Sequence, residues 1–253
     1  MISHEEIFPS EVKLPSFNSN AIEFSIGNIP GLSEHFIYAN DDMFFGRPLI
    51  INDFFNEDGI PIIPYRKRKW SNPNIEFKII TFHNNKDDFA GFQFKAVTTN
   101  TACACESFFR RKMVGEYMHT PVPLTLSLFR RANGSFRKEI KSTIFSRFRS
   151  YKNYEMQLLM LLYGINTKLI APVEITPDIA SFVVVKKEGD IYLIPLTIKD
   201  PKFFCINVDL DKIRGKIQEW LEHRFPLKSS FEKCDYTLNS TVNNKTNFPN
   251  IYW

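Results

Sequence analysis

The chain has 253 residues and a formal net charge of +4, from 32 Lys and Arg against 28 Asp and Glu. This length allows a sizeable core in one large domain, and 43% apolar with 24% charged residues is ordinary globular composition. The mild positive charge suits anionic substrates but does not indicate nucleic-acid binding, which we exclude as a partner class. No window has the length and hydropathy of a transmembrane helix, and the N-terminus lacks a basic-then-apolar signal. We therefore expect a cytoplasmic protein, with peripheral attachment to the inner membrane as the alternative.

Two elements are predicted near the N-terminus. Ser19 or Asn20 can cap a short helix over residues 21–24, which Gly27 would end. Residues 36–39 have the length and composition of a strand, and this strand ends abruptly in Asn40-Asp41-Asp42. Open α/β sheets place ligand sites just beyond the carboxyl ends of strands, where adjacent carboxylates invite a divalent cation that neutralises a diphosphate. A solvated Asx turn is the alternative interpretation of the same residues.

The next part of the chain has weaker signals. Residues 56–75 contain Gly59, several prolines and the basic run Arg66-Lys67-Arg68-Lys69, which predicts an irregular excursion. The basic run is interpreted as a solvated loop, with contact to an anionic acceptor or a lipid headgroup as the alternative. Residues 77–82 are a candidate strand. Residues 98–112 are predicted to be helical.

The C-terminal half contains more regular patterns. Residues 115–123 are predicted to break regular structure around His119-Thr120-Pro121. Two helices are expected next, over residues 124–131 and 136–145 and joined at Asn133-Gly134, followed by an apolar helix over 155–162 that Gly164 would end. A hairpin over 183–185 and 191–194 and a strand over 203–207 are then predicted. A helix over 210–223 and a loosely ordered tail over 234–253 complete the chain.

A second group of residues can carry chemistry. His119 lies beside a proline in a glycine-bounded loop, where its imidazole can take a proton from an attacking hydroxyl at neutral pH. Arg147 and Arg149 can bind phosphate, because the planar guanidinium binds pairs of oxygens and stays charged. The alternatives are a surface or structural histidine and solvated arginines. The four cysteines are not spaced like a zinc site, and we expect reduced thiols.

The segment from Glu6 to Phe55 resembles the second conserved region of the Stealth family. The resemblance rests on the stretch from Leu14 to Glu23, on Ile29-Pro30-Gly31-Leu32-Ser33-Glu34-His35 and on the segment from His35 to Pro48. Members of this family are sugar-1-phosphate transferases, which include bacterial capsular polysaccharide phosphotransferases and the animal N-acetylglucosamine-1-phosphotransferase of lysosomal enzyme tagging. The matching residues form a long segment with an unusual sequence, so a chance match is not expected.

Two further regions of the family have counterparts. The segment from His119 to Ser150 is similar to the third region, in which a histidine and an arginine about thirty residues later belong to the active site; Arg149 keeps that spacing. Asn153 or Glu155 is the nearest counterpart of an acidic residue that follows in the family. Residues 202–207 and 225–232 are similar to the fourth region. The chain departs there at Val208, where the family usually has Asp, while Asn207 can still hydrogen-bond a phosphate or a sugar.

The family's first conserved region, a strand that helps to bind the nucleotide, has no counterpart. The resemblance therefore implies an α/β fold with a Rossmann-like or glycosyltransferase-A-like core, truncated at its N-terminus and carrying a helical insertion. It predicts one catalytic domain over residues 1–233, with the second region at about 3–56, the third at about 115–165 and the fourth at about 200–233. A complementing N-terminal fragment is an expected partner.

The resemblance implies transfer of a sugar-1-phosphate from a nucleotide diphosphate sugar, such as UDP-N-acetylglucosamine, to a hydroxyl of a surface polysaccharide. Asp41 and Asp42 would hold Mg²⁺ or Mn²⁺. Asp42, His119 and Arg149 would be catalytic, with His119 as the base. The expected substrate contacts are Asn18, Asn40, Arg147 and Asn207. The chain would work beside the capsule-assembly machinery.

Two other functions stay open. One is a catalytically inactive remnant that binds polysaccharide or a partner protein. The other is a metal-dependent glycosyltransferase that transfers the sugar without its phosphate. Analysis of the products separates the two enzyme hypotheses, since phosphoryl transfer releases a nucleoside monophosphate and glycosyl transfer releases the diphosphate.

Overall fold

The computed structural model describes residues 1–70, 89–208 and 211–227 of the chain. The chain divides into two compact units, Met1–Asp209 and Leu210–Trp253. In the second unit, the described elements are the 3₁₀ turn η5 (Asp211–Ile213) and the helix α9 (Arg214–Arg224). All the described strands belong to the first unit, which also holds the candidate site.

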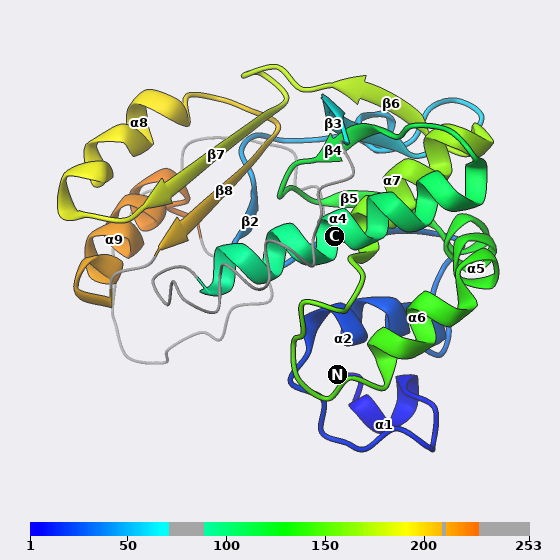
Figure 1. Ribbon diagram of the computed structural model, residues 1–253. Coiled ribbons are helices and arrows are strands. Elements are labelled where there is room, and N and C mark those ends of the chain that lie inside the picture. Colours follow the sequence, from blue (N-terminus) through cyan, green and yellow to red (C-terminus); the bar gives the residue numbers. More distant parts are fainter. Residues whose placement is uncertain (71–88, 209–210, 228–253) are drawn as a thin grey trace. The chain divides into compact units, whose positions relative to one another are not determined.

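The first unit is a mixed α/β structure with three small sheets (Figure 1). Parallel pairing joins β7 to β8 and β3 to β6, and the other pairs are antiparallel. The sheets contain, in spatial order, β1 (His35–Tyr38) with β5 (Val122–Thr125); β2 (Met43–Phe45), β8 (Phe203–Val208) and β7 (Ala180–Val185); and β4 (Val114–Tyr117), β3 (Ile62–Lys69) and β6 (Ala171–Glu174).

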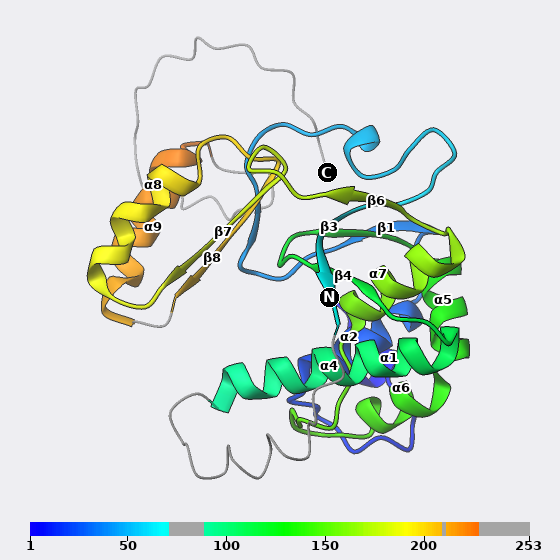
Figure 2. The same ribbon diagram turned by 45° about the horizontal axis from the view of Figure 1, so that its top comes forward.

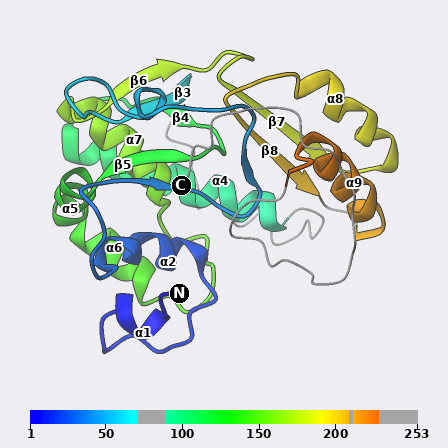
Figure 3. The same ribbon diagram turned by 180° about the vertical axis from the view of Figure 1, so that it is seen from behind.

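Several helices of this unit pack against one another. Figure 2 shows α4 (Phe89–Phe109) beside α7 (Met156–Thr167), and Figure 3 shows α1 (His4–Ile7), α2 (Ser19–Ser25) and α6 (Arg137–Ile144) gathered together. The remaining described elements of this unit are α5 (Leu126–Ser135), α8 (Ile194–Thr197) and the 3₁₀ turns η1 (Ile26–Asn28), η2 (Ile51–Asp53) and η4 (Glu188–Leu193). No helix in the described part of the chain is long and apolar enough to cross a membrane.

The helix α7 is the centre of the main core. Its sequence is apolar on all sides, and the residues from Met156 to Gly164 are buried, as expected for a helix enclosed by other elements. Glu155 caps it by accepting hydrogen bonds from the backbone N–H groups of Gln157 and Leu158. Gly164 was expected to end this helix, but the helix continues to Thr167. The glycine is needed inside it because a Cβ there would lie 2.5 Å from the side chain of Ile170.

Many predicted elements are confirmed. The short helix is α2, the strand before Asn40 is β1, and the strand over 203–207 is β8. The helices expected between residues 98 and 162 correspond to α4, α5, α6 and α7, although the junction of α5 with α6 lies at Phe136 and not at Asn133-Gly134. The candidate strand over 77–82 and the tail over 234–253 lie outside the described residues.

Two local predictions are wrong and a third is correct only in part. Residues 62–69, expected to be irregular, form β3, because this segment pairs with β4 on one side and β6 on the other. The break expected over residues 115–123 is confirmed around His119-Thr120-Pro121 but is shorter than expected, because residues 115–117 belong to β4 and residues 122–123 to β5. The expected hairpin does not form: residues 188–193 are a 3₁₀ turn, and β7 pairs instead with β8. In each case pairing with a distant segment overrides the local pattern.

Candidate active site

A cavity of about 650 Å³ is lined by residues of the helices α2, α4 and α7, of the strands β3, β4, β7 and β8 and of nearby turns. The turn after β1 contributes Asn40, Asp41 and Asp42, the turn after β4 contributes His119, and β8 contributes Asn207. The other lining residues are Ser19, Asn20, Glu23, Arg66, Gln93, Phe94, Val97, Glu116, Tyr117, Met118, Arg149, Glu155, Gln157 and Phe182. The structure therefore brings together most of the residues that the sequence singled out.

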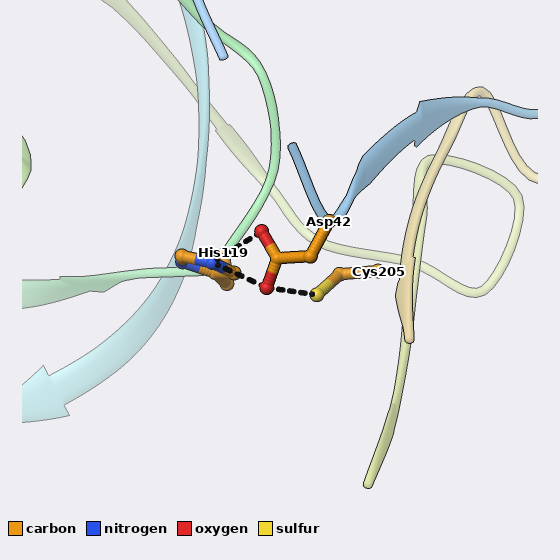
Figure 4. A group of neighbouring side chains, drawn as sticks. All are labelled: Asp42, His119 and Cys205. Atoms are coloured by element: carbon orange, nitrogen blue, oxygen red, sulfur yellow. Dashed lines mark hydrogen bonds and ion pairs between the residues drawn. The ribbon is translucent and has the colours of Figure 1, made fainter. Parts of the chain in front are cut away.

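Asp42 lies at the centre of a group of three side chains (Figure 4). His119 Nε2 is 3.1 Å from both carboxylate oxygens of Asp42, and the Cys205 thiol donates to Asp42 Oδ2 at 3.4 Å. Burial, followed by the neighbouring Asp42 carboxylate, raises the pKa of Cys205 above its ordinary value, which keeps the thiol protonated. Asp42 is thus positioned to orient the imidazole ring of His119.

The same group could hold a metal ion. The ligand atoms of Asp42, His119 and Cys205 all lie within 4.8 Å of one another. A set with oxygen, nitrogen and sulfur donors is typical of softer metals, whereas Mg²⁺ prefers carboxylates together with the phosphates of its substrate. The exposed Asp41 lines the same cavity as Asp42.

Two buried carboxyl groups lie in the wall of the cavity. Glu23 and Glu155 are 7% and 4% exposed. Burial raises the pKa of Glu23 to about 7, while the hydroxyl of Tyr38 and the charge of Arg149 act in the opposite direction. Burial, together with the charge of Glu23, raises the pKa of Glu155 to about 8. The cavity therefore contains carboxyl groups that hold protons near neutral pH as well as the more exposed Asp42.

A chain of polar contacts joins Glu23 to the histidine. The Tyr38 hydroxyl is 2.9 Å from Glu23 Oε1 and also contacts Asn40 Oδ1, while Asn40 Nδ2 is 3.5 Å from His119 Nε2. A tyrosine hydroxyl has one proton and cannot donate to two acceptors at once. Glu23 and Asn40 therefore compete for the single proton of the Tyr38 hydroxyl.

The loop between α6 and α7 presents Arg149 to the cavity. Asn18, expected to contact substrate, is instead fully buried and donates from Nδ2 to Ser146 O and Asn153 Oδ1, both at 2.9 Å. Arg147 donates to Pro15 O at 3.1 Å and lies over the ring of Phe17. Neither Asn18 nor Arg147 lines the cavity. Both fasten the loop that carries Arg149.

Sequence reasoning gave no role to Glu23 or Cys205. Both lie inside segments that carry the family resemblance, but the sequence alone does not show that Glu23 is buried beside another acid, nor that Cys205 faces Asp42. For Glu155, the sequence indicated only that Asn153 or Glu155 is the nearest counterpart of an acidic residue of the family.

Comparisons with known proteins identify the family of this chain. Residues 1–63 match the family model described as Stealth protein CR2, conserved region 2. An exopolysaccharide phosphotransferase of Lactiplantibacillus plantarum is 30% identical over 257 residues, which cover 92% of this chain and 73% of the relative. An exopolysaccharide phosphotransferase of Streptomyces coelicolor is 30% identical and a capsular polysaccharide phosphotransferase of Neisseria meningitidis serogroup A is 29% identical.

The alignments with these relatives cover almost the whole length of this chain. The match covers 92% of this chain in each case, but only 39% of the Streptomyces protein and 42% of the Neisseria protein. The chain thus spans less than half the length of these two relatives. The names of these relatives place this chain in the class of transferase enzymes. The chain belongs to the Stealth family of phosphotransferases.

Proposed function

We propose that this chain transfers a sugar-1-phosphate from a nucleotide diphosphate sugar to a hydroxyl group of a surface polysaccharide. The observation that supports it most strongly is the convergence of Asp41, Asp42, His119 and Arg149 on one cavity. The matched relatives are named exopolysaccharide and capsular polysaccharide phosphotransferases, which agrees with this assignment. The donor we favour is UDP-N-acetylglucosamine or a similar molecule, bound in a glycosyltransferase-A-like or Rossmann-like domain over residues 1–233.

In the reaction, the acceptor oxygen bonds to the phosphorus that carries the sugar, and the bond from this phosphorus to the nucleotide oxygen breaks. His119 takes the proton of the acceptor hydroxyl, with its ring held by Asp42 at 3.1 Å. Arg149 stabilises the charge on the transferring phosphoryl group. Asn40 and Asn207 offer amide groups to the phosphate or the sugar. The products are a phosphodiester and a nucleoside monophosphate.

A divalent cation fits this site. Asp41 and Asp42 would hold Mg²⁺ or Mn²⁺, since both cations favour carboxylate oxygens. When bound, the cation neutralises negative charge on the diphosphate. We propose no direct substrate contact for Asn18 and Arg147. Both residues keep the Arg149 loop in place.

Product analysis tests the reaction. Incubating the chain with UDP-N-acetylglucosamine, Mg²⁺ and a polysaccharide acceptor should release UMP, and Arg149→Ala should lower kcat on the order of a hundredfold or more. Lys152→Ala is the control, because Lys152 is an exposed cation of the same loop that does not line the cavity. Release of UDP would favour glycosyl transfer. An Arg149→Ala variant with normal turnover would contradict the role of Arg149.

A further inference from the structure

A second cavity adjoins the first. It has a volume of about 780 Å³ and shares Arg66, Met118 and Phe182 with the candidate active site. Its other lining residues are Arg47, Ile175, Thr176, Pro177, Asp178, Ala180, Ser181, Leu196, Thr197, Lys199 and Asp200. This mixture of hydroxyl, apolar and charged side chains is a suitable lining for a sugar chain that carries negative charge.

The cations of this cavity differ in their partners. Arg47 binds Asp178 through both ends of its guanidinium, at 2.9 and 3.1 Å, and also donates to Asp200 O. Its charge is therefore neutralised within the wall. Arg66 and Lys199 have no side-chain hydrogen bond or ion pair among the described residues. They give the cavity a net positive charge.

Arg66 also differs from its neighbours on β3. Lys67 forms an ion pair with Glu174 at 2.8 Å, and Arg68 binds Glu116 and lies 4.2 Å from the ring centre of Trp70. These two cations have partners on the sheet itself. Arg66 instead lines both cavities, so its guanidinium is available to a ligand that extends from one to the other.

The boundary between the cavities lies beside the reacting groups. His119 follows Met118 in the chain, and its ring is in edge contact with Phe182, with 6.4 Å between ring centres. Both Met118 and Phe182 belong to the shared wall. An acceptor whose hydroxyl reaches His119 from this side would therefore leave the rest of its chain in the second cavity.

We propose that Arg66 and Lys199 of the second cavity bind the phosphodiester that precedes the terminal sugar of the acceptor. This inference rests on the proposed function. An enzyme that forms phosphodiesters produces a chain whose terminal sugar is linked to the preceding sugar by a negatively charged phosphodiester. Arg66 contacts this anion at the boundary of the two cavities, and Lys199, which lines only the second cavity, contacts it from within that cavity. The acceptor class is thus a phosphodiester-linked sugar chain and not a neutral polysaccharide.

Isothermal titration without a donor tests this site. The probe is a dimer of N-acetylglucosamine joined by one phosphodiester, and the comparison is the neutral disaccharide N,N′-diacetylchitobiose. The phosphodiester should bind about tenfold more tightly than the neutral sugar, and Arg66→Gln and Lys199→Gln should each remove most of this difference. Arg66→Lys keeps the charge and should retain part of it. Lys67→Gln, from the same strand, is the matched control and should bind like the wild type.

A separate titration with UDP-N-acetylglucosamine and Mg²⁺ identifies the anion that Arg66 and Lys199 recognise. Lys199 lines only the second cavity, so Lys199→Gln should bind this donor normally. Equal binding of the phosphodiester and the neutral sugar, or a loss confined to donor binding, would overturn the acceptor site while leaving UMP release unaffected. Phosphodiester binding that depends on Arg66 and Lys199 without any UMP release would support this site and contradict the proposed reaction.

Discussion

The carboxyl side chains of the candidate site have two kinds of environment. Asp42 is 33% exposed and accepts hydrogen bonds from His119 and Cys205, whereas Glu23 and Glu155 are almost completely buried. Burial raises the pKa of both glutamates, because the charged form loses its hydration. The site can therefore retain protons on the buried pair near neutral pH.

The raised pKa of Glu155 predicts how stability changes with pH. Below about pH 4.5 this carboxyl group is protonated in the folded and the unfolded chain. Between pH 4.5 and about 8 the unfolded chain loses the proton while the folded chain keeps it, so the free energy of unfolding falls as pH rises. Glu155→Gln should remove this loss and become more stable than the wild type by on the order of a few kcal/mol at pH 9.

Urea unfolding of both proteins across pH 4–9 measures this difference. The variant keeps a side-chain oxygen that can cap α7, so its fold should be retained. Glu57→Gln is the control, because Glu57 is exposed and its replacement should leave the pH dependence unchanged. Parallel stability curves for Glu155→Gln and the wild type would contradict the raised pKa of Glu155.

Among the elements, the loop between α6 and α7 is held from several sides. Asn18 donates to Ser146 and Asn153, Asn100 Nδ2 donates to Tyr151 O at 2.7 Å, and the Phe17 N–H donates to Arg147 O at 2.8 Å. These contacts come from α4 and from the segment before α2. They fix the position of Arg149 although Arg149 itself is exposed.

Asn18 is therefore predicted to act by positioning this loop. Asn18→Ala removes the hydrogen bonds to Ser146 O and Asn153 Oδ1, of which Asn153 Oδ1 keeps the N–H of Ser150 as a donor, and should lower the free energy of unfolding by about 1–3 kcal/mol. It should also lower kcat more strongly than it raises KM for the donor, because Arg149 acts in the transition state. Steady-state kinetics and urea unfolding of the same preparation measure both effects.

Asn28→Ala is the matched control for this prediction. Its side chain donates to Ile7 O at 2.8 Å, away from the Arg149 loop. It should lose stability but keep kcat. A kcat for Asn18→Ala equal to that of Asn28→Ala would show that Asn18 has a structural role alone.

At the scale of the whole unit, the cavity depends on the packing of segments that are far apart in the chain. Asp42, His119 and Cys205 come from three separate parts of the sequence and meet within 4.8 Å. Ligand binding to such a site stabilises the entire folded unit, because the unfolded chain cannot bind.

UDP-N-acetylglucosamine with Mg²⁺, at about one hundred times its Kd, should stabilise the protein by about 2.7 kcal/mol and raise Tm by about 5 to 10 °C. Removing the cation with EDTA, or replacing Asp42 by Asn, should abolish most of this shift, since the diphosphate then lacks its counter-charge. Differential scanning calorimetry measures the shift. An equal shift in the presence of EDTA would contradict a cation site at Asp41 and Asp42.

The sequence by itself predicted the mixed α/β class, the strand before Asn40, most helices and six of the residues that line the cavity, namely Asn40, Asp41, Asp42, His119, Arg149 and Asn207. These features depend on local periodicity, on turn residues and on the family resemblance, all of which can be seen along the chain. Tertiary structure alone decided that residues 62–69 form a strand, because their pairing partners are β4 and β6. It also decided that Asn18 supports a loop and that Glu23 and Glu155 share a buried wall. Burial and long-range pairing arise from contacts between distant segments, and no local pattern of residues determines them.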